Sequence, residues 1–408
     1  MTVAPPTLHA AIDEILPGLV ADRRHLHEHP ELGFQEVETA KFVAARLAQL
    51  GVEDIRTGIA KTGVTGLIRG TGTGPNADKV LMLRADMDAL PILEENDVEY
   101  VSQNAGVMHA CGHDAHTAML LATTRLLMER RGEFAGTVKV LFQPSEEIQP
   151  GGAKPMIEAG ALEDPHVHAS FGLHMAQDTP LGQITTRPGA SSANSDRFYI
   201  TVQGKGGHGA RPHASVDPIV IGSQIVIALQ TLVSRETDPL KSAVVTVGSF
   251  NAGSAPNIIP DTAELVGSMR THDTELRDRL AERMDTIVTD VARALGGSAT
   301  LRFVRGYPSV VNDEAMFEIV RGAAESVVGP DNFFVKEPSM GGEDMSYFLQ
   351  EVPGCFFHVG SKNEDRGLVW GHHHPKFDID EASLGIGVEV MVTSVLNYFA
   401  NPDAPSRG

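Results

Sequence analysis

The sequence has few of the residues and segments on which several protein classes depend. Its 408 residues include two cysteines, Cys111 and Cys355, which are too few for a disulfide framework. Its apolar runs all fall well short of the roughly 20 residues that a membrane-spanning helix needs. Basic residues are scarce, and the formal net charge of −20 argues against nucleic acid or an anionic membrane as a partner.

The composition is otherwise that of a globular protein. Hydrophobic residues make up 42% of the chain and charged residues 21%. Because single cores rarely grow beyond about 300 residues, the length predicts two domains. Residues 1–14 lack the basic and apolar regions of a signal peptide, so we expect a cytoplasmic protein.

Helix and strand patterns alternate in the first and last parts of the chain. Strands are expected at 65–69, 80–84, 137–142, 168–174 and 355–359, and helices at 16–27, 36–50, 114–131, 314–328 and 381–399. This alternation predicts an α/β fold with a mainly parallel sheet covered by helices. The tail beyond about residue 401 is expected to be frayed.

The middle of the chain has a different order of elements. The expected elements are a strand at 197–202, a helix at 217–235, strands at 243–250 and 262–270, a helix at 274–295 and a strand at 299–304. This β-α-β-β-α-β order is the ferredoxin-like arrangement. We therefore predict a catalytic domain in two parts, residues 1–186 and 305–408, with an inserted lid or dimerisation domain at 187–304.

Ligand-type side chains are concentrated where a loop leads into the helix expected from residue 114. They are His109, Cys111, His113, Asp114 and His116. A thiolate and an imidazole two residues apart can hold one metal ion or straddle a pair of ions. Asp114 is expected to cap the helix or to orient a neighbouring imidazole. The alternative is a small buried cysteine beside histidines that only make hydrogen bonds.

More ligand-type residues follow the expected strands, at the sheet edge where α/β proteins gather their functional groups. They are Asp86 and Asp88, the adjacent pair Glu146 and Glu147, His174, and the run His372 to His374. Asp86 and Asp88 should face opposite ways, so that one faces the metal ligands and the other makes structural hydrogen bonds. Of the two glutamates, one can bind metal while the other acts as a general base. Solvated turns and a histidine-rich surface loop are the alternatives.

Counting the candidates gives a set of five metal ligands: Cys111, His113, Glu147, His174 and His373. This exceeds what one tetrahedral ion needs, which favours two divalent ions with a bridging water. The thiolate favours zinc, whereas the carboxylate also suits manganese; cobalt and nickel are further candidates. In the inserted domain, His208 lies in a glycine-rich loop, and Asn257 and Arg270 are suited to bind a carboxylate.

Several motifs in this chain match one enzyme family. They are Met108-His-Ala-Cys-Gly-His-Asp-Ala-His-Thr, Arg84-Ala-Asp-Met-Asp-Ala-Leu-Pro, Phe142-Gln-Pro-Ser-Glu-Glu, Phe171-Gly-Leu-His, Gly341-Gly-Glu-Asp-Met-Ser and His373-His-Pro-Lys-Phe-Asp-Ile-Asp-Glu. The chain resembles the dinuclear metal amidohydrolases, which include hippurate hydrolase, N-acyl-amino-acid amidohydrolases and auxin-conjugate hydrolases. The matches extend from His25 to Glu381.

The resemblance implies a role for each candidate residue. It gives the same five metal ligands and makes Glu146 the catalytic acid and base. His208 would stabilise the oxyanion in a partner subunit's active site, so a homodimer or homotetramer is expected. Asn257 and Arg270 would bind the substrate's carboxylate. A wider group of relatives has a His-x-Asp motif where this chain has Asp86-Met-Asp88, which leaves the role of Asp86 open; either neighbour of His373 could replace it as the ligand.

The implied activity is metal-dependent hydrolysis of the amide bond of a small N-acyl amino acid. A dipeptidase or carboxypeptidase-like enzyme on the same scaffold is the closest alternative, and a non-catalytic metal-binding protein is a more distant one. The first would have to hold a free α-amine, for which the sequence has no evident group. The second is hard to reconcile with a glutamate at position 146 beside Glu147.

Overall fold

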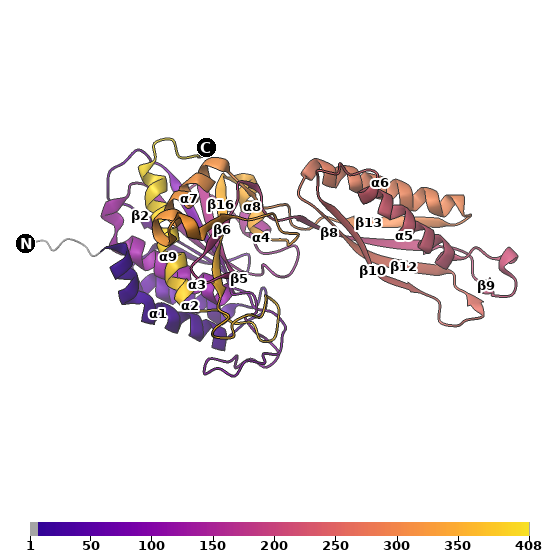
Figure 1. Cartoon of the computed structure of the whole chain (residues 1–408), viewed down its shortest axis with the longest axis horizontal. Coiled ribbons are helices and arrows are strands. Elements are labelled where there is room, and N and C mark those ends of the chain that lie inside the picture. Colours follow the sequence, from indigo (N-terminus) through magenta and orange to yellow (C-terminus); the bar gives the residue numbers. More distant parts are fainter. Residues whose placement is uncertain (1–6, 408) are drawn as a thin grey trace, which may run out of the picture. The chain divides into compact units, whose positions relative to one another are not determined.

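The computed structural model describes residues 7–407, and the chain divides into two compact units (Figure 1). Unit 1 comprises Met1–Gly189, Val311–Glu337 and Asp344–Gly408, and unit 2 comprises Ala190–Val310 and Pro338–Glu343. The predicted insertion at 187–304 is thus close to unit 2, which also takes in a short segment from later in the chain. Residues 1–6 of the predicted first domain lie outside the described residues.

Unit 1 is built on an eight-stranded sheet with the strand order β1-β2-β4-β3-β5-β16-β6-β15. Its strands are β1 (Glu53–Ile59), β2 (Gly63–Arg69), β3 (Val80–Asp86), β4 (Thr137–Gln143), β5 (Ala169–Pro180), β6 (Ile184–Thr186), β15 (Phe333–Val335) and β16 (Gly354–Lys362). The four central strands β4, β3, β5 and β16 are parallel, as predicted. Strand β3 is buried along its whole length, which explains its continuous apolar sequence.

Helices pack on both faces of this sheet. They are α1 (Leu8–Glu28), α2 (Val37–Gln49), α3 (His113–Glu129), α4 (Ala153–Glu158), α7 (Glu314–Val328), α8 (Met345–Glu351) and α9 (Ala382–Ala400). Helix α9 is long and apolar enough to cross a membrane, but two thirds of its apolar window is buried against α1, α3, α7 and β16. This is the environment of a core helix. Helices α4 and α8 pack together, and α8 contacts β5 and β16 (Figure 1).

Unit 2 has the predicted β-α-β-β-α-β order. Its main elements are β8 (Asn194–Gln203), α5 (Pro218–Ser234), β10 (Ala243–Ala252), β12 (Thr262–Thr271), α6 (Thr274–Ala294) and β13 (Ser298–Val304). The four strands are antiparallel in the order β10-β12-β8-β13, and a separate hydrophobic core lies between them and the two helices. The short strands of the chain are β7 (Gly189–Ala190), β9 (Gly207–His208), β11 (Ile258–Ile259) and β14 (Val311–Asn312).

Two local expectations were wrong, those for His174 and for the C-terminal tail, and one of the two alternatives for Asp114 is excluded. His174 does not end its strand, because β5 continues to Pro180 alongside β16. Asp114 does not cap α3, whose N-cap is Gly112 without a side-chain hydrogen bond. The C-terminal tail is not frayed: the Arg407 amide donates to the His168 carbonyl, and its guanidinium donates to the carbonyls of Gln350 and Glu351.

Candidate metal centre

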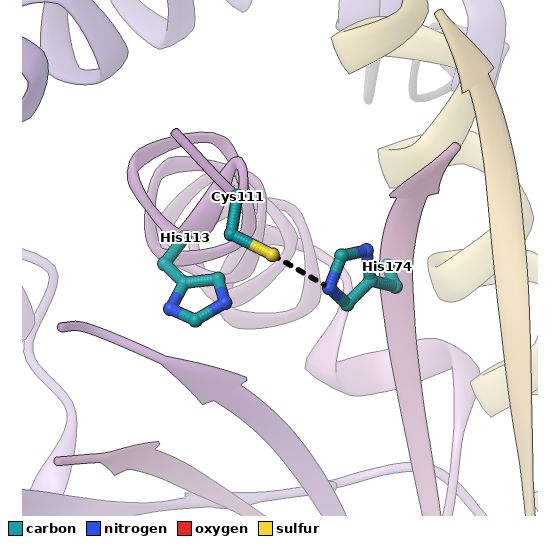
Figure 2. A group of neighbouring side chains, drawn as sticks. All are labelled: Cys111, His113 and His174. Carbon is teal, nitrogen blue, oxygen red and sulfur yellow. Dashed lines mark hydrogen bonds between the residues drawn. The ribbon is translucent and has the colours of Figure 1, made fainter. Parts of the chain in front are cut away.

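Cys111 and His113 flank the glycine at which α3 begins. Gly112 has a φ of 92°, and a Cβ built there would lie 3.1 Å from the Met175 side chain. A residue with a side chain would therefore be strained and crowded at this position. Figure 2 shows the Cys111 sulfur directed at the ring of His174, on β5, with His113 beside it at the start of α3.

His113 is oriented by Asp88. The ring Nδ1 lies 2.9 Å from the Asp88 carbonyl oxygen and 3.2 Å from its carboxylate Oδ1, so Nδ1 carries the proton and donates. The other nitrogen, Nε2, is buried and has no hydrogen-bond partner among residues 7–407. A histidine that donates through one nitrogen and presents the other bare is the arrangement found in metal sites.

His174 is also held through its Nδ1, and its Nε2 faces another candidate ligand. Its Nδ1 donates to the Met175 carbonyl over 2.7 Å, and its Nε2 lies 3.6 Å from Cys111 Sγ (Figure 2). The Met175 amide in turn donates to Nε2 of His116, whose Nδ1 donates to Asp86 over 2.6 Å. Both nitrogens of His116 are therefore engaged, so His116 positions β5 and is not available as a ligand.

The adjacent glutamates follow β4 through a strained turn. Ser145 has a φ of 52°, a left-handed conformation that is unfavourable for serine, and its amide donates to Glu36. The amides of Glu146 and Glu147 donate to the two oxygens of Asp88 over 2.9 and 3.0 Å. One carboxylate thus fixes the backbone of both glutamates as well as the ring of His113.

Among the three consecutive histidines, His373 reaches the other candidate ligands. It has a φ of 65°, its amide donates to the Ala110 carbonyl, and its Nε2 lies 3.1 Å from Glu147 Oε1. His372 donates to the Met175 carbonyl instead, and His374 stacks on Trp370 and accepts from the Lys376 amide. The left-handed backbone separates the three side chains, which sequence alone did not resolve.

The five predicted ligands form two overlapping groups. The ligand atoms of Cys111, His113 and His174 lie within 4.8 Å of one another, and so do those of Cys111, Glu147 and His373. Cys111 belongs to both groups, and Glu146 forms a third with His113 and Glu147. Sulfur, imidazole and carboxylate donors at these separations, with a bare buried nitrogen among them, suit a pair of neighbouring divalent cations.

The electrostatics of the site also favour cations. Burial acts to lower the pKa of His113, but Asp86, Asp88 and Glu147 outweigh it and raise that pKa to about 10. Burial raises the pKa of Cys111 well above its usual range, and the negative charges of the glutamates raise it further. Acidic groups thus dominate the local field, and cations would offset their repulsion and convert the thiol to a thiolate.

The three aspartates expected to orient ligands have different partners. Asp88 contacts His113 and both glutamates directly. Asp86 forms an ion pair with Arg84 and accepts from His116, and its Oδ2 lies 3.7 Å from His113 Nε2. Asp86 and Asp88 therefore approach His113 from opposite sides, whereas only one of them was expected near the ligands.

Asp114 faces a different network. It accepts from Arg23 over 2.8 Å and from His27 over 2.7 Å, both on α1. The imidazole that it orients is therefore that of His27. His109 is also buried near this network, and within the described residues neither of its ring nitrogens has a hydrogen-bond partner. Burial lowers the pKa of His109 to about 3.

The candidate residues of unit 2 do not all lie together. His208 pairs with Ile258 across β9 and β11, and the Gly209 amide donates to the Asn257 carbonyl, so His208 and Asn257 are neighbours. The segment that carries Asn257 and β11 leads into β12 at Thr262. Arg270 lies eight residues further along β12, so the distance from Thr262 to Arg270 is roughly 26 Å at about 3.3 Å per residue. Its guanidinium donates to the Met340 carbonyl.

Sequence reasoning missed the supports behind the site. Arg84, which is buried, forms ion pairs with Asp86 and with Asp344, and Gln143 donates to the same Asp344. A charged residue inside a continuous apolar strand was the available signal, since a buried arginine needs acidic partners. The partner from 260 residues later could not be identified without the fold.

Known proteins with similar sequences and structures cover nearly the whole chain. The family model for peptidase family M20/M25/M40 matches residues 82–397. The chain is 41% identical over 384 residues to the IAA-amino acid hydrolase ILR1-like 4 of Arabidopsis thaliana, covering 93% of this chain and 85% of the relative. It is 41% identical over 370 residues to the N-acetyl-L-cysteine deacetylase of Bacillus subtilis, covering 90% and 84%.

Two further similarities bear on the chemistry. The thermostable carboxypeptidase 2 of Saccharolobus solfataricus is 40% identical over 379 residues, covering 92% of this chain and 94% of the relative. The crystal structure of the Bacillus subtilis protein YXEP, described as a dinuclear metal-binding peptidase of the M20 family, is 36% identical with a TM-score of 0.82. That similarity covers 95% of this chain and 99% of the YXEP chain.

Proposed function

The chain belongs to peptidase family M20/M25/M40, and from this premise we propose that it hydrolyses the amide bond of N-acyl amino acids with the help of two divalent metal ions. The names of two relatives support this reaction, because an IAA-amino acid hydrolase and an N-acetyl-L-cysteine deacetylase both release an amino acid from an acyl group. The observation that carries the proposal is the convergence of five donor side chains beside Glu146.

Cys111, His113, Glu147, His174 and His373 are the proposed metal ligands. Cys111 belongs to both groups of donors, so its thiolate would help to hold the cations. The thiolate favours zinc, and manganese, cobalt and nickel are the alternatives. Bound cations would supply Lewis acidity, which lowers the pKa of an attacking water and polarises the scissile carbonyl.

Glu146 is the proposed acid and base. It is buried, lies beside Glu147, and has its backbone fixed by Asp88. Its carboxylate accepts the proton of the attacking water and then delivers that proton to the leaving amine nitrogen. The amide C–N bond breaks as the water oxygen becomes part of the product carboxylate.

The residues of unit 2 are proposed to act in an assembly of at least two copies. Arg270 lies roughly 26 Å along β12 from Thr262, at about 3.3 Å per residue, and Asn257 lies beside Gly209, five residues before Thr262. We therefore do not assign both side chains of one chain to the same carboxylate. We assign Arg270 to the substrate carboxylate, and assign His208 and Asn257 to the active site of the partner copy. His208 would donate to the developing oxyanion, a contribution of about 2.7–4 kcal/mol if typical.

A substrate panel tests the reaction. The protein is loaded in turn with zinc, manganese, cobalt and nickel, and each form is assayed on N-acetyl and N-benzoyl amino acids. We expect release of the free amino acid with at least one cation and none after chelation. A metal-loaded protein that leaves every N-acyl amino acid intact would contradict the proposal.

A peptidase activity is the second candidate, favoured by the likeness to thermostable carboxypeptidase 2. The same panel distinguishes the two, because a dipeptide presents a free amine where an N-acyl amino acid presents an uncharged acyl group. Preference for unblocked dipeptides over their N-acyl counterparts would support the peptidase. The main proposal predicts the opposite order.

A further inference from the structure

The candidate metal centre opens to solvent on the side of His373. The His373 side chain is 53% exposed, whereas His113 is fully buried and Glu147 is 10% exposed. A substrate can therefore approach past the segments that carry His373 and Glu147, whose side chains lie 3.1 Å apart. These two segments form the rim of the site.

Exposed apolar residues lie next to both ligands on this rim. Ile148 follows Glu147 directly and is 51% exposed. Val369 and Trp370 come shortly before His373 and are 42% and 44% exposed. Trp370 is the only tryptophan of the chain. Large apolar side chains that are exposed within a few residues of proposed ligands favour a surface that binds a ligand.

The indole of Trp370 is held in place from behind. The His374 ring stacks on it with centroids 4.3 Å apart and an interplanar angle of 13°. His374 itself is fixed by the Lys376 amide at its Nδ1 and by its own amide, which donates to the Gly371 carbonyl. The Lys376 ammonium lies 6.0 Å from the centre of the indole ring, at the outer limit of a cation–π contact. The indole is thus a preorganised flat surface that still has much of its area exposed.

We propose that Trp370, which is exposed three residues before the proposed ligand His373, is a specificity-determining contact for the acyl group and favours an aromatic acyl group over acetyl. The inference rests on the proposed function, because it concerns the substrate of the same site. The amino-acid half of the substrate carries a carboxylate, whereas the acyl half is uncharged, so the apolar rim matches the acyl half. A planar ring gains from stacking on the indole, and a methyl group is too small to cover it.

The test compares two amides of one amino acid. The kcat/KM values for its N-benzoyl and N-acetyl derivatives are measured for the wild-type protein, for Trp370→Ala and for Trp370→Phe. We expect Trp370→Ala to lower the ratio of benzoyl to acetyl kcat/KM by about 2- to 13-fold, mainly through KM, because it removes the stacked aromatic contact. Trp370→Phe should keep most of the ratio.

A matched control is Val335→Ala, which removes another exposed apolar side chain, in β15. It should leave the ratio unchanged, and the metal content of all variants should equal that of the wild type. An unchanged ratio in Trp370→Ala would overturn the inference, as would an equal fall for both substrates. A wild-type protein that hydrolyses neither amide would instead overturn the proposed function.

Discussion

Asp88 contacts three parts of the candidate site through one carboxylate. It accepts hydrogen bonds from the amides of Glu146 and Glu147 and fixes the ring of His113. We expect Asp88→Ala to weaken metal binding by about 10- to 100-fold, as typically follows the loss of a hydrogen-bond partner behind a ligand. Titration against a competing chelator measures this change.

The control for Asp88→Ala is Asp331→Ala, which removes an exposed carboxylate from the same unit. Its metal affinity should match that of the wild type. If Asp88→Ala bound metal as tightly as the control, the orientation of His113 by Asp88 would be irrelevant to the site.

Glu146 and Glu147 are neighbours with different proposed roles, and substitution separates them. Glu146→Gln should retain both cations but lose about 10²–10⁴-fold in kcat, because the amide can neither accept nor return the proton. Glu147→Gln should lose metal as well as turnover, because Glu147 is a proposed metal ligand and its carboxylate lies beside the imidazole of another, His373. Metal content and kcat are measured on the same preparations. Near-normal turnover by Glu146→Gln would remove its proposed role.

At the scale of whole elements, a buried charge network joins three helices of unit 1. Arg23 on α1 is fully buried and forms ion pairs with Asp114, at the start of α3, and with Asp378, shortly before α9. Burial acts to raise the pKa of Asp114, but Arg23 and His27 outweigh it and hold that pKa well below its usual range. The network fixes the start of α3, and therefore the position of His113.

Arg23→Met should destabilise the protein by about 3–5 kcal/mol, because it leaves buried carboxylates without their counter-charge. Urea denaturation measures the loss, with Lys41→Ala as the control, since that lysine pairs with Glu38 at the surface. The stabilising effect of Asp114 is present above the unfolded-state pKa of about 3.9 and is lost as the pH falls through its lower folded-state pKa. Equal midpoints for both variants would contradict the network's role.

Elements with a strong local pattern could be predicted from the sequence, and those that depend on a distant partner could not. The six main elements of unit 2 each carry their own periodicity or turn, and their predicted order was confirmed. The second half of β5 was missed because Gln177 and Asp178 interrupt its apolar pattern. Gln177 is nevertheless buried, because Ser361 of β16 donates to it.

The candidate site could be predicted as a set of residues but not as a geometry. Motifs and residue types brought out all five proposed ligands, since cysteine, histidine and paired glutamates are conspicuous at the ends of apolar runs. The choice of His373 over its neighbours depends on a left-handed backbone. The role of His116 depends on the Met175 amide, 59 residues later. Neither feature can be recognised from the composition of the sequence or from the spacing of its residues.

At the scale of the whole molecule, the segment that forms unit 2 lies in sequence between strands that belong to one sheet of unit 1. Strand β16 lies between β5 and β6, although it comes after the inserted unit in the chain. Unit 2 has a hydrophobic core of its own, made of different residues from the core of unit 1. Each unit therefore has a core around which it can pack independently. His373 comes from the last part of the chain, so it can join the other proposed ligands only after that part has been synthesised.

The separation of Asn257 from Arg270 makes the assembly testable by complementation. If His208 and Asn257 act in a partner's site, Glu146→Gln and His208→Ala will each be nearly inactive as homodimers. A mixed dimer contains one site with an intact Glu146 from one copy and an intact His208 from the other. Mixing and reassociating equal amounts should therefore restore about one quarter of wild-type activity in a symmetric dimer, because half of the dimers are mixed and each has one intact site.

Mixing Glu146→Gln with Glu147→Gln is the matched control for complementation. Both substitutions affect the proposed metal centre of the same unit, so a mixed dimer has no site in which both residues are intact. Activity in the first mixture but not in the second requires that His208 act across the interface. Equal activity in both mixtures would place His208 and Glu146 in the same copy's site. The substrate carboxylate would then have to be bound without Asn257, because Asn257 and Arg270 of one chain are too far apart to bind it together.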